Sequence, residues 1–449
     1  MKKTIKFILL ILLLTPFICL AQNEREVKRT FIDAEYHLLY NEYEEALPLF
    51  KELYDGGRKN ANISYRLGQC YLHIKGEKEK AIPFLEKAAN NITANYDVGY
   101  FDEKKAPQKA LFYLGVAYRT NNDIEQAMNS FKSYKTKIQD DQEELIRVKA
   151  ELKACSTALE LKKKPTNVLE KNLGKKINSS YAEIHPVVSG DQSTLVFVSK
   201  LKFYDAVFYS RKINGKWSSA KNISLDFESS RPLKPVHLSY DGKTLYLTRN
   251  DNNDFNIYVS NFNKNRWSPV VPVSDKINSE AFEKHAATSK DGNVIYFTSN
   301  RKGGYGGYDI YKSYKDENGN WSKPENLGST INTEFNESAP FITENRKKIY
   351  FSSQGHKNMG GYDIFYSQKK NNSWNKPVNM GFPINTTDND KFFFPLKNGK
   401  VAYFSKVKPD NYGKTDIYRL ELYKRENIPA KEKKLKVSEP DETSMSNTD

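Results

Sequence analysis

The pattern of apolar and polar residues divides the chain into a helical part and a strand-rich part. Between residues 27 and 163 the apolar residues recur with a helical period, in segments that contain little glycine. From residue 166 onward they gather in short runs bounded by turn residues, as in β-strands. The turn Lys162-Lys-Lys-Pro165 marks the boundary. We therefore expect an α-helical domain followed by an all-β domain.

A short motif recurs within the helical part. Leu67-Gly68-x-x-Tyr71 returns as Leu114-Gly115-x-x-Tyr118, and Ala34 takes the glycine position in a looser first copy 34 residues earlier. Small residues at this position let paired helices approach closely. The copies resemble tetratricopeptide (TPR) repeats, which have this period. The resemblance implies a TPR-like helical domain over residues 22–164, with a concave face that receives a partner peptide.

The strand-rich part repeats with a period of about 50 residues. In each copy an apolar strand follows a turn and precedes a loop, and the central residues lie 50 to 54 positions apart: Phe197, Leu247, Phe297, Phe351 and Phe404. Four tryptophans keep the same spacing: Trp217, Trp267, Trp321 and Trp374. A period near 50 with several short strands per repeat is typical of a β-propeller. We expect five blades over residues 165–423, with six as the alternative.

The two ends of this part complement each other. The first repeat lacks a preceding tryptophan strand, and the fifth ends at Tyr418 without one. We therefore expect the segment from Asn167 to Leu173 to pair into the last blade. Such pairing closes the ring and removes two open sheet edges.

The third and fourth repeats carry the clearest motif, Gly303-Gly-Tyr-Gly-Gly-Tyr-Asp-Ile-Tyr311 and Met359-Gly-Gly-Tyr-Asp-Ile-Phe365. They resemble PD40 or WD40-like propeller repeats, which are related to those of the Tol–Pal protein TolB. Ala206 and Asn256 stand at the position of Asp309 in the first two repeats, which therefore depart from the pattern.

The order of leader, TPR array and PD40 propeller resembles the front half of Bacteroidetes exported envelope proteins that continue into an OmpA-like peptidoglycan-binding domain. Some of those proteins are periplasmic parts of the type IX secretion and gliding machinery. The resemblance implies a non-enzymatic scaffold that binds envelope proteins through the TPR groove and a propeller face. The sequence contains no OmpA-like domain, so peptidoglycan anchoring is not implied.

The first residues have the pattern of a secretory signal peptide, residues 1–21. A basic start precedes the apolar run from Ile8 to Leu14, and Cys19-Leu20-Ala21 places small residues before the cleavage point. The run is too short to span a membrane. Lipidation of Cys19 is the alternative, which the bulky Ile18 before it disfavours. We expect an exported protein that is periplasmic or peripherally associated with the outer membrane.

Composition adds little to this assignment. The net charge of +15 includes three leader lysines, and the other lysines are mixed with acidic residues along the chain. No nucleic-acid-binding motif is present, so we expect no nucleic-acid partner. Residues 424–449 are rich in Lys, Glu and Ser without periodicity and are expected to form a disordered tail. Cys70 and Cys155 are expected to be buried thiols, with a disulfide between them as the alternative.

Several repeated propeller residues have a structural explanation. One tryptophan per blade fits packing between blades better than sugar stacking. The aspartates of the glycine-rich loops are expected to accept hydrogen bonds from turn amides, with a calcium site as the alternative. These residues are Asp309, Asp363 and Asp416.

A second set of acidic residues recurs at one position of the repeat. It comprises Glu183, Glu283, Glu337 and Asp390, and a histidine follows two residues later in two repeats, at His185 and His285. A separation of two places both side chains on one face of a strand. On an innermost strand they would line the channel mouth and bind a cation or a basic peptide. The alternative is a local structural role, and Leu233 interrupts the ring in the second repeat.

No catalytic motif accompanies these residues. The sequence has no Gly-x-Ser-x-Gly elbow and no CxxC or HExxH metal motif. We therefore expect no catalytic residues, no cofactor and no metal. Because propeller glycosidases place carboxylates at the channel mouth, a carbohydrate-binding or glycoside-cleaving propeller is the alternative function.

Overall fold

The computed structural model of the protein describes residues 24–251 and 254–423. The expected signal peptide, with Cys19, and the expected tail over residues 424–449 lie outside these residues. Among the described residues, no helix combines the length and the apolar character needed to cross a membrane.

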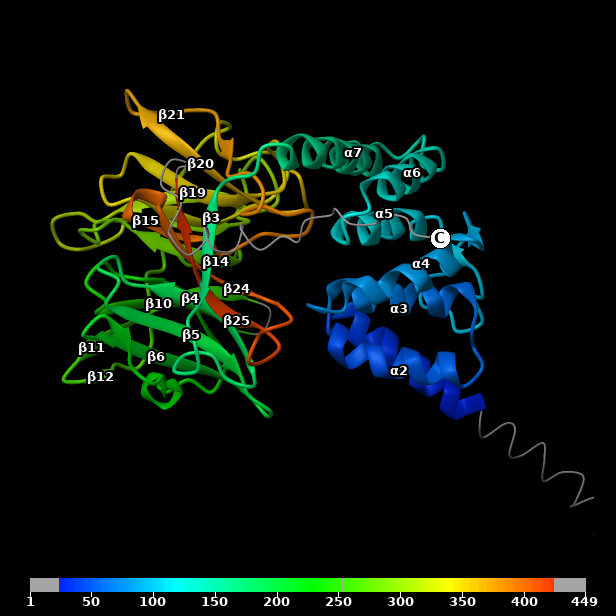
Figure 1. The fold of residues 1–449 in the computed structure, drawn as a ribbon, viewed down its shortest axis with the longest axis horizontal. Coiled ribbons are helices and arrows are strands. Elements are labelled where there is room, and N and C mark those ends of the chain that lie inside the picture. The colour runs from blue at the N-terminus through cyan, green and yellow to red at the C-terminus, as the bar shows by residue number, and fades with distance from the viewer. Residues whose placement is uncertain (1–23, 252–253, 424–449) are drawn as a thin grey trace, which may run out of the picture. The chain divides into compact units, whose positions relative to one another are not determined.

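The first compact unit is an array of paired helices and passes into the second between Leu161 and Lys162 (Figure 1). Its elements are a helix over residues 24–39, α2 (Tyr43–Asp55), α3 (Ala61–His73), the 3₁₀ helix η1 (Lys78–Lys80), α4 (Ala81–Ala89), β1 (Ile92–Thr93), β2 (Ala106–Pro107), α5 (Ala110–Thr120), α6 (Ile124–Lys135) and α7 (Gln142–Lys162). Cys70 and Cys155 are buried free thiols, so no disulfide joins them. The predicted TPR-like helical repeat is confirmed.

Two glycines explain how closely the helices pair. A Cβ atom added at Gly68 would lie 2.4 Å from Leu85 Cγ of α4, and one at Gly115 would lie 2.6 Å from Phe131 Cε1 of α6. Such distances are far inside van der Waals contact. Ala34, the equivalent residue of the first pair, is fully buried. The motif therefore requires a small residue because the neighbouring helix occupies the space of a larger one.

The second unit is a β-propeller whose blades are antiparallel sheets, each with its first strand nearest the axis (Figure 1). Blade one contains β4 (Ala182–Val188), β5 (Thr194–Lys200), β6 (Asp205–Ile213), β7 (Lys216–Trp217) and β8 (Lys221–Asn222). Blade two contains β9 (Leu233–Leu238), β10 (Thr244–Asn250), β11 (Phe255–Asn263), β12 (Arg266–Trp267) and β13 (Val271–Pro272). Blade three contains β14 (Glu283–Thr288), β15 (Val294–Ser299), β16 (Asp309–Tyr314) and β17 (Glu325–Asn326). Blade four contains β18 (Glu337–Ile342), β19 (Lys348–Ser353), β20 (Asp363–Lys370), β21 (Ser373–Trp374) and β22 (Val378–Asn379).

Blade five is assembled from both ends of the unit. It contains β23 (Phe394–Leu396), β24 (Val401–Lys406), β25 (Asp416–Leu422) and, from the start of the unit, β3 (Val168–Asn172). Strand β3 pairs antiparallel with β25, and Asn172 Nδ2 donates a hydrogen bond of 2.7 Å to Asp416 Oδ2. The predicted closure and the predicted five blades are confirmed, so the six-blade alternative is excluded.

The tryptophans lie between blades. Trp267 of blade two packs against Tyr209 of blade one, with ring centroids 6.1 Å apart. Trp217 contacts blade five in the same way, and Trp321 and Trp374 pack against the blades that precede theirs. Each tryptophan thus connects its own blade to the preceding one.

Candidate functional site

The strand order gives the propeller two different ends. The turns that follow β4, β9, β14, β18 and β23 lie at one end, which we call the turn face. The loops that follow β5, β10, β15, β19 and β24 lie at the other end, which we call the loop face. The glycine-rich motifs belong to the loop face, and the acidic residues of the expected ring lie at the adjoining ends of the inner strands.

A bulge separates each glutamate of the expected ring from the histidine that follows it. The pairing register shifts between Ile184 and Val187 in β4 and between Glu283 and Ala286 in β14. Such a bulge breaks the alternation of side chains along a strand. The glutamates consequently turn into their blades and the histidines toward the axis, so the expected common face is not present.

The glutamate carboxylates are enclosed within the blades. Glu183, Glu283 and Glu337 are at most 1% exposed. Glu337 Oε2 accepts a hydrogen bond of 2.7 Å from the Thr333 amide, and its Oε1 accepts bonds from the hydroxyls of Thr333 (2.8 Å) and Ser353 (2.6 Å). Serines make the same three contacts to the other two glutamates. Each carboxylate therefore ties the segment that enters its blade to the first two strands.

The two histidines lie at the axis on either side of Phe392. The ring centroids of His185 and His285 are 4.6 and 5.2 Å from that of Phe392. His285 Nδ1 lies 2.9 Å from the Ser338 hydroxyl, and burial lowers the pKa of His285 well below its usual value. Asp390, the fourth acidic residue, is partly exposed in blade five. The structure therefore brings the histidines together but not the carboxylates.

The aspartates of the glycine-rich loops hold those loops in place. Asp309 Oδ2 accepts hydrogen bonds from the Tyr305 amide (2.6 Å) and from Asn326 Nδ2 (2.7 Å), and Oδ1 accepts one from the Gly306 amide (3.1 Å). Among the described residues no group of three or more His, Cys, Asp and Glu side chains is placed to bind a metal ion. The corresponding contacts are those of Asp416 with Tyr412, Gly413 and Asn172, and that of Asp363 with Asn379.

The helical unit covers part of its own surface with an insertion, residues 91–107. The Tyr96 hydroxyl donates a hydrogen bond of 2.6 Å to Asn62 Oδ1 in α3. The Phe101 ring packs against Phe31 of the helix over residues 24–39, with centroids 5.6 Å apart. The insertion therefore packs on α3 and on the helix over residues 24–39.

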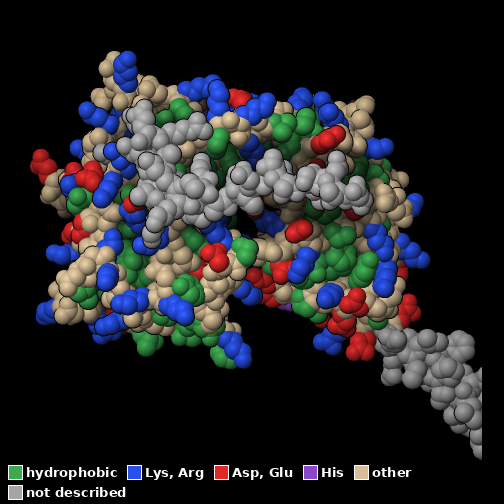
Figure 2. All heavy atoms as spheres, viewed as in Figure 1, with side chains coloured by type: hydrophobic (Ala, Val, Ile, Leu, Met, Phe, Trp, Pro, Cys, Tyr) green, Lys and Arg blue, Asp and Glu red, His purple; other side chains and the backbone are tan. Residues whose placement is uncertain are grey.

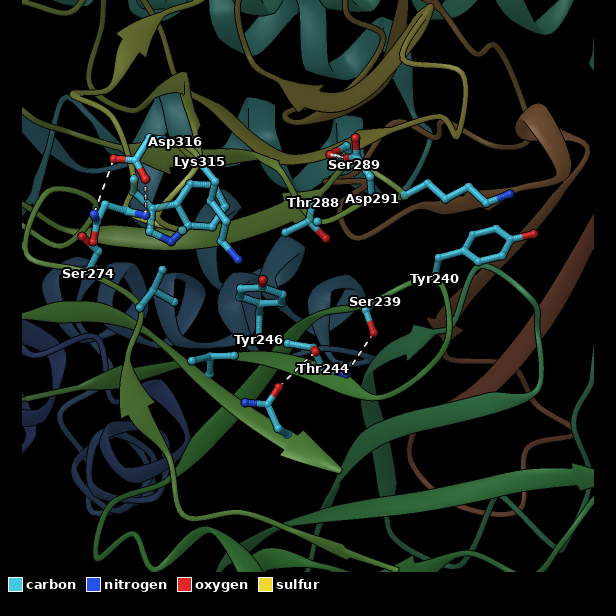
Figure 3. A pocket seen from close by; sticks show the side chains of 18 of the residues that line it. Ser239, Tyr240, Thr244, Tyr246, Ser274, Thr288, Ser289, Asp291, Lys315 and Asp316 are labelled. Atoms are coloured by element: carbon cyan, nitrogen blue, oxygen red, sulfur yellow. Dashed lines mark hydrogen bonds between the residues drawn. The ribbon is translucent and has the colours of Figure 1, made fainter. Parts of the chain in front are cut away.

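The sequence analysis missed a cleft of about 820 Å³ between blades two and three, at the turn face (Figure 3). Tyr246 points into the cleft from β10, and Thr288 faces it from β14. Trp321 also lines it. Its charged lining residues have both signs: Asp241, Asp275, Lys276, Lys290, Asp291, Lys315 and Asp316.

Two differences between repeats create this cleft. Between blades one and two, the rings of Tyr209 and Phe262 stack with centroids 5.7 Å apart. The residues at the same register in the next interface are Val259 and Lys315. A smaller apolar side chain and a flexible charged one leave open the space that the two rings fill. Comparing the repeats at Tyr209 and Val259 would have given this signal from the sequence.

Several exposed aromatic side chains lie on loops of the loop face. We call this set the aromatic rim, and its exposed fractions range from 40% to 86%. Lys202 Nζ lies 5.2 Å from the ring centre of Phe203, and Lys175 Nζ lies 5.7 Å from that of Tyr412. The rim is therefore both aromatic and basic. Its members are Tyr181, Phe203, Tyr204, Tyr305 and Tyr412.

Comparison with known proteins supports the helical repeat directly. Residues 109–137, which comprise α5 and α6, match the family model of the tetratricopeptide repeat. The comparison with curated proteins found no match.

Several solved structures show a distant similarity to this chain. TolB from Acinetobacter baumannii is 17% identical over 54% of this chain and 54% of its own, with a TM-score of 0.36. The putative TolB from Agrobacterium tumefaciens is 13% identical over 55% and 78%, with a TM-score of 0.34. The α-L-arabinofuranosidase from Podospora anserina in complex with cellotriose is 10% identical over 58% and 98%, with a TM-score of 0.37. The match spans about half of the Acinetobacter protein, and none of these similarities assigns a function.

Proposed function

We propose that the protein is a non-enzymatic scaffold that binds envelope proteins through the aromatic rim of its propeller. Single exposed apolar side chains are ordinary on protein surfaces. Here, large aromatic side chains from blades one, three and five share one face, and Tyr and Phe are enriched in the cores of protein interfaces. Lys175 and Lys202 beside the rim favour a partner with an acidic surface.

The proposed envelope setting rests on the leader pattern and on the order of TPR array and propeller. Both features resemble exported proteins of outer-membrane or type IX secretion assemblies. Figure 2 shows Lys and Arg side chains scattered among acidic ones over one face of the molecule. Such a mixed distribution suits protein contacts better than a continuous track for nucleic acid.

Crosslinking of the tagged protein in intact cells, followed by mass spectrometry, tests this proposal. The wild type should recover envelope proteins, and the double variant Phe203→Ser/Tyr204→Ser should recover them about tenfold less, since interface aromatics carry much of the binding free energy. Ile213→Ser is the matched control because Ile213 is 64% exposed at the opposite end of β6. Equal recovery by the wild type and the double variant would overturn the proposal.

The proposal assigns no catalysis to the acidic residues of the inner strands. Glycoside hydrolysis requires two carboxyl groups that flank an open sugar site. Glu183, Glu283 and Glu337 are instead enclosed by hydrogen bonds within their own blades. Hydrolysis of aryl glycosides by the purified protein, abolished in a Glu283→Gln variant that remains folded, would contradict this part of the proposal.

A further inference from the structure

The cleft between blades two and three contains an accessible polar group, the Tyr246 hydroxyl, that forms no hydrogen bond within the described part of the fold. Tyr246 is only 6% exposed, and its hydroxyl points into the cleft (Figure 3). Within residues 24–251 and 254–423, no side chain or backbone group forms a hydrogen bond with this hydroxyl. The Tyr246 hydroxyl is therefore placed to bond to an atom of a ligand.

The protonation state of this hydroxyl fits that role. Burial raises the pKa of Tyr246 to about 12. The hydroxyl consequently keeps its proton at neutral pH, where it can both donate and accept a hydrogen bond. A ligand hydroxyl has the same double capacity and is a suitable partner.

Two aromatic rings border the cleft beside this group, and a lysine lies over a face of each. Trp321 and Tyr240 line the cleft. Lys315 Nζ lies 4.9 Å from the ring centre of Trp321, and Lys290 Nζ lies 4.1 Å from that of Tyr240. Aromatic rings with a polar neighbour offer apolar contact and hydrogen bonds together. A sugar ring needs both, because its C–H face is apolar and its edge carries hydroxyl groups.

The outer part of the cleft offers further hydrogen-bonding groups without a dominant charge. Thr244 Oγ1 donates a hydrogen bond of 3.0 Å to Asn261 Oδ1, which leaves the amide NH₂ of Asn261 as a donor for a ligand. Asp275 and Lys276 are exposed side by side on the segment between the blades. Because the lining contains both carboxylates and ammonium groups, neither anions nor cations are strongly favoured.

We propose that this cleft binds a short neutral oligosaccharide. Its volume of about 820 Å³ falls within the range of small-molecule sites, roughly 300–1,000 Å³. The lining includes hydroxyl, amide, carboxylate and ammonium groups beside apolar ones, a mixture that suits the hydroxyl groups and C–H faces of a sugar. The site lies at the turn face, away from the aromatic rim, and stands independently of the scaffold function proposed above.

Isothermal titration calorimetry on the full chain tests the site with four neutral trisaccharides: maltotriose, cellotriose, xylotriose and tri-N-acetylchitotriose. At least one should bind saturably with one site per chain, whereas trigalacturonate, which is anionic, should bind at least tenfold more weakly. Absence of binding by all four neutral probes at millimolar concentration would overturn the proposal. Preferential binding of trigalacturonate or of a charged peptide would overturn it as well.

Two variants locate the binding in the cleft. Tyr246→Phe removes only the hydroxyl and should weaken binding about tenfold. Val259→Tyr restores the aromatic residue that blade one carries as Tyr209, and it should abolish binding by filling the cleft. Tyr296→Phe is the matched control, because Tyr296 holds the position of Tyr246 in blade three but does not line the cleft.

A loss of binding must be distinguished from a loss of folded structure. Melting temperatures of all three variants are measured alongside, and Tyr246→Phe carries the test if Val259→Tyr does not fold. Equal weakening by Tyr246→Phe and Tyr296→Phe would place the sugar elsewhere and overturn the assignment.

Discussion

At the scale of single residues, the glutamate that recurs in blades one, three and four makes the same hydrogen bonds, but its charged neighbours differ between blades. Glu283 lies beside Arg301, whose Nη2 is 3.1 Å from the carboxylate Oε1. Blade four has Gly355 at the position of Arg301. Burial raises the pKa of Glu337 from 4.5 to about 7, and hydrogen bonds from Ser353 and Thr333 oppose this only in part. Glu337 therefore binds its proton more tightly in the folded than in the unfolded chain.

We expect Glu337→Gln to gain stability relative to the wild type as the pH rises. The folded-state pKa of Glu337 lies above its ordinary value, so its stabilisation is fully present below pH 4.5 and is lost as the pH rises through about 7. Glutamine does not ionise, so the variant does not lose stability in this way as the pH rises. The melting temperature of the variant minus that of the wild type should increase by roughly 5 °C between about pH 4.5 and 8.

The exposed Glu334→Gln, measured in the same way, is the control for general effects of a lost carboxylate. A difference between Glu337→Gln and the wild type that stays constant with pH would contradict the assigned role of burial.

The sequence located these acidic positions but not the direction of their side chains. Their recurrence at one position of the repeat can be read from the sequence alone. Their direction depends on the bulge, where His185 has a φ of +52° and Ala339, in blade four, has a φ of +47°. A glycine at these positions would have indicated a left-handed backbone, but histidine and alanine give no such indication. The prediction that residues two apart share one face of the strand was therefore wrong at the positions of the expected ring.

At the scale of elements, the blades repeat more faithfully than the interfaces between them. In blades one, three and four a lysine lies over the ring of the blade's tryptophan. Blade two has Phe262 at this position, and its interface with blade one is aromatic and closed. Strand positions follow from local hydrophobic patterns, so the sequence predicted them. The cleft depends on which side chains of adjacent blades meet, and no single repeat shows that.

Loss of an inter-blade tryptophan should destabilise the propeller. Trp267 is 1% exposed and packs against blade one, so Trp267→Ala should lower the free energy of unfolding by about 3–5 kcal/mol. Urea unfolding of the full chain, followed by tyrosine and tryptophan fluorescence and by circular dichroism, measures the change. Trp374→Ala is the matched control, because Trp374 is only partly buried and should cost less. An unchanged midpoint in Trp267→Ala would contradict the packing role.

At the scale of the whole molecule, the propeller is a ring closed by two segments that lie far apart in the sequence. Closure was predictable because the last repeat lacks its outer strand and an unassigned strand-like segment precedes the first repeat. The packing of the insertion over residues 91–107 was not predictable, since it depends on contacts such as that of Tyr96 with Asn62 in another helix pair. The topology of repeated segments can thus be predicted from the sequence. The packing of an irregular segment depends on contacts with other parts of the chain, which the sequence does not show.

Closure by β3 predicts how two propeller fragments behave. A fragment of residues 165–423 contains β3 and should be monomeric, with a single cooperative unfolding transition. A fragment of residues 174–423 lacks β3 and leaves the edge of β25 unpaired, so it should associate, because open strand edges pair with other chains. Light scattering after gel filtration, together with urea unfolding, distinguishes the two.

The variant Asn172→Ala in the longer fragment separates the strand from one of its side-chain contacts. It loses the hydrogen bond to the buried Asp416 and should lower the free energy of unfolding by about 1–3 kcal/mol while the fragment stays monomeric. Its effect should therefore be smaller than that of removing β3, because the backbone pairing with β25 remains. If the 174–423 fragment is monomeric and unfolds at the same urea concentration as the 165–423 fragment, closure by β3 does not stabilise the ring.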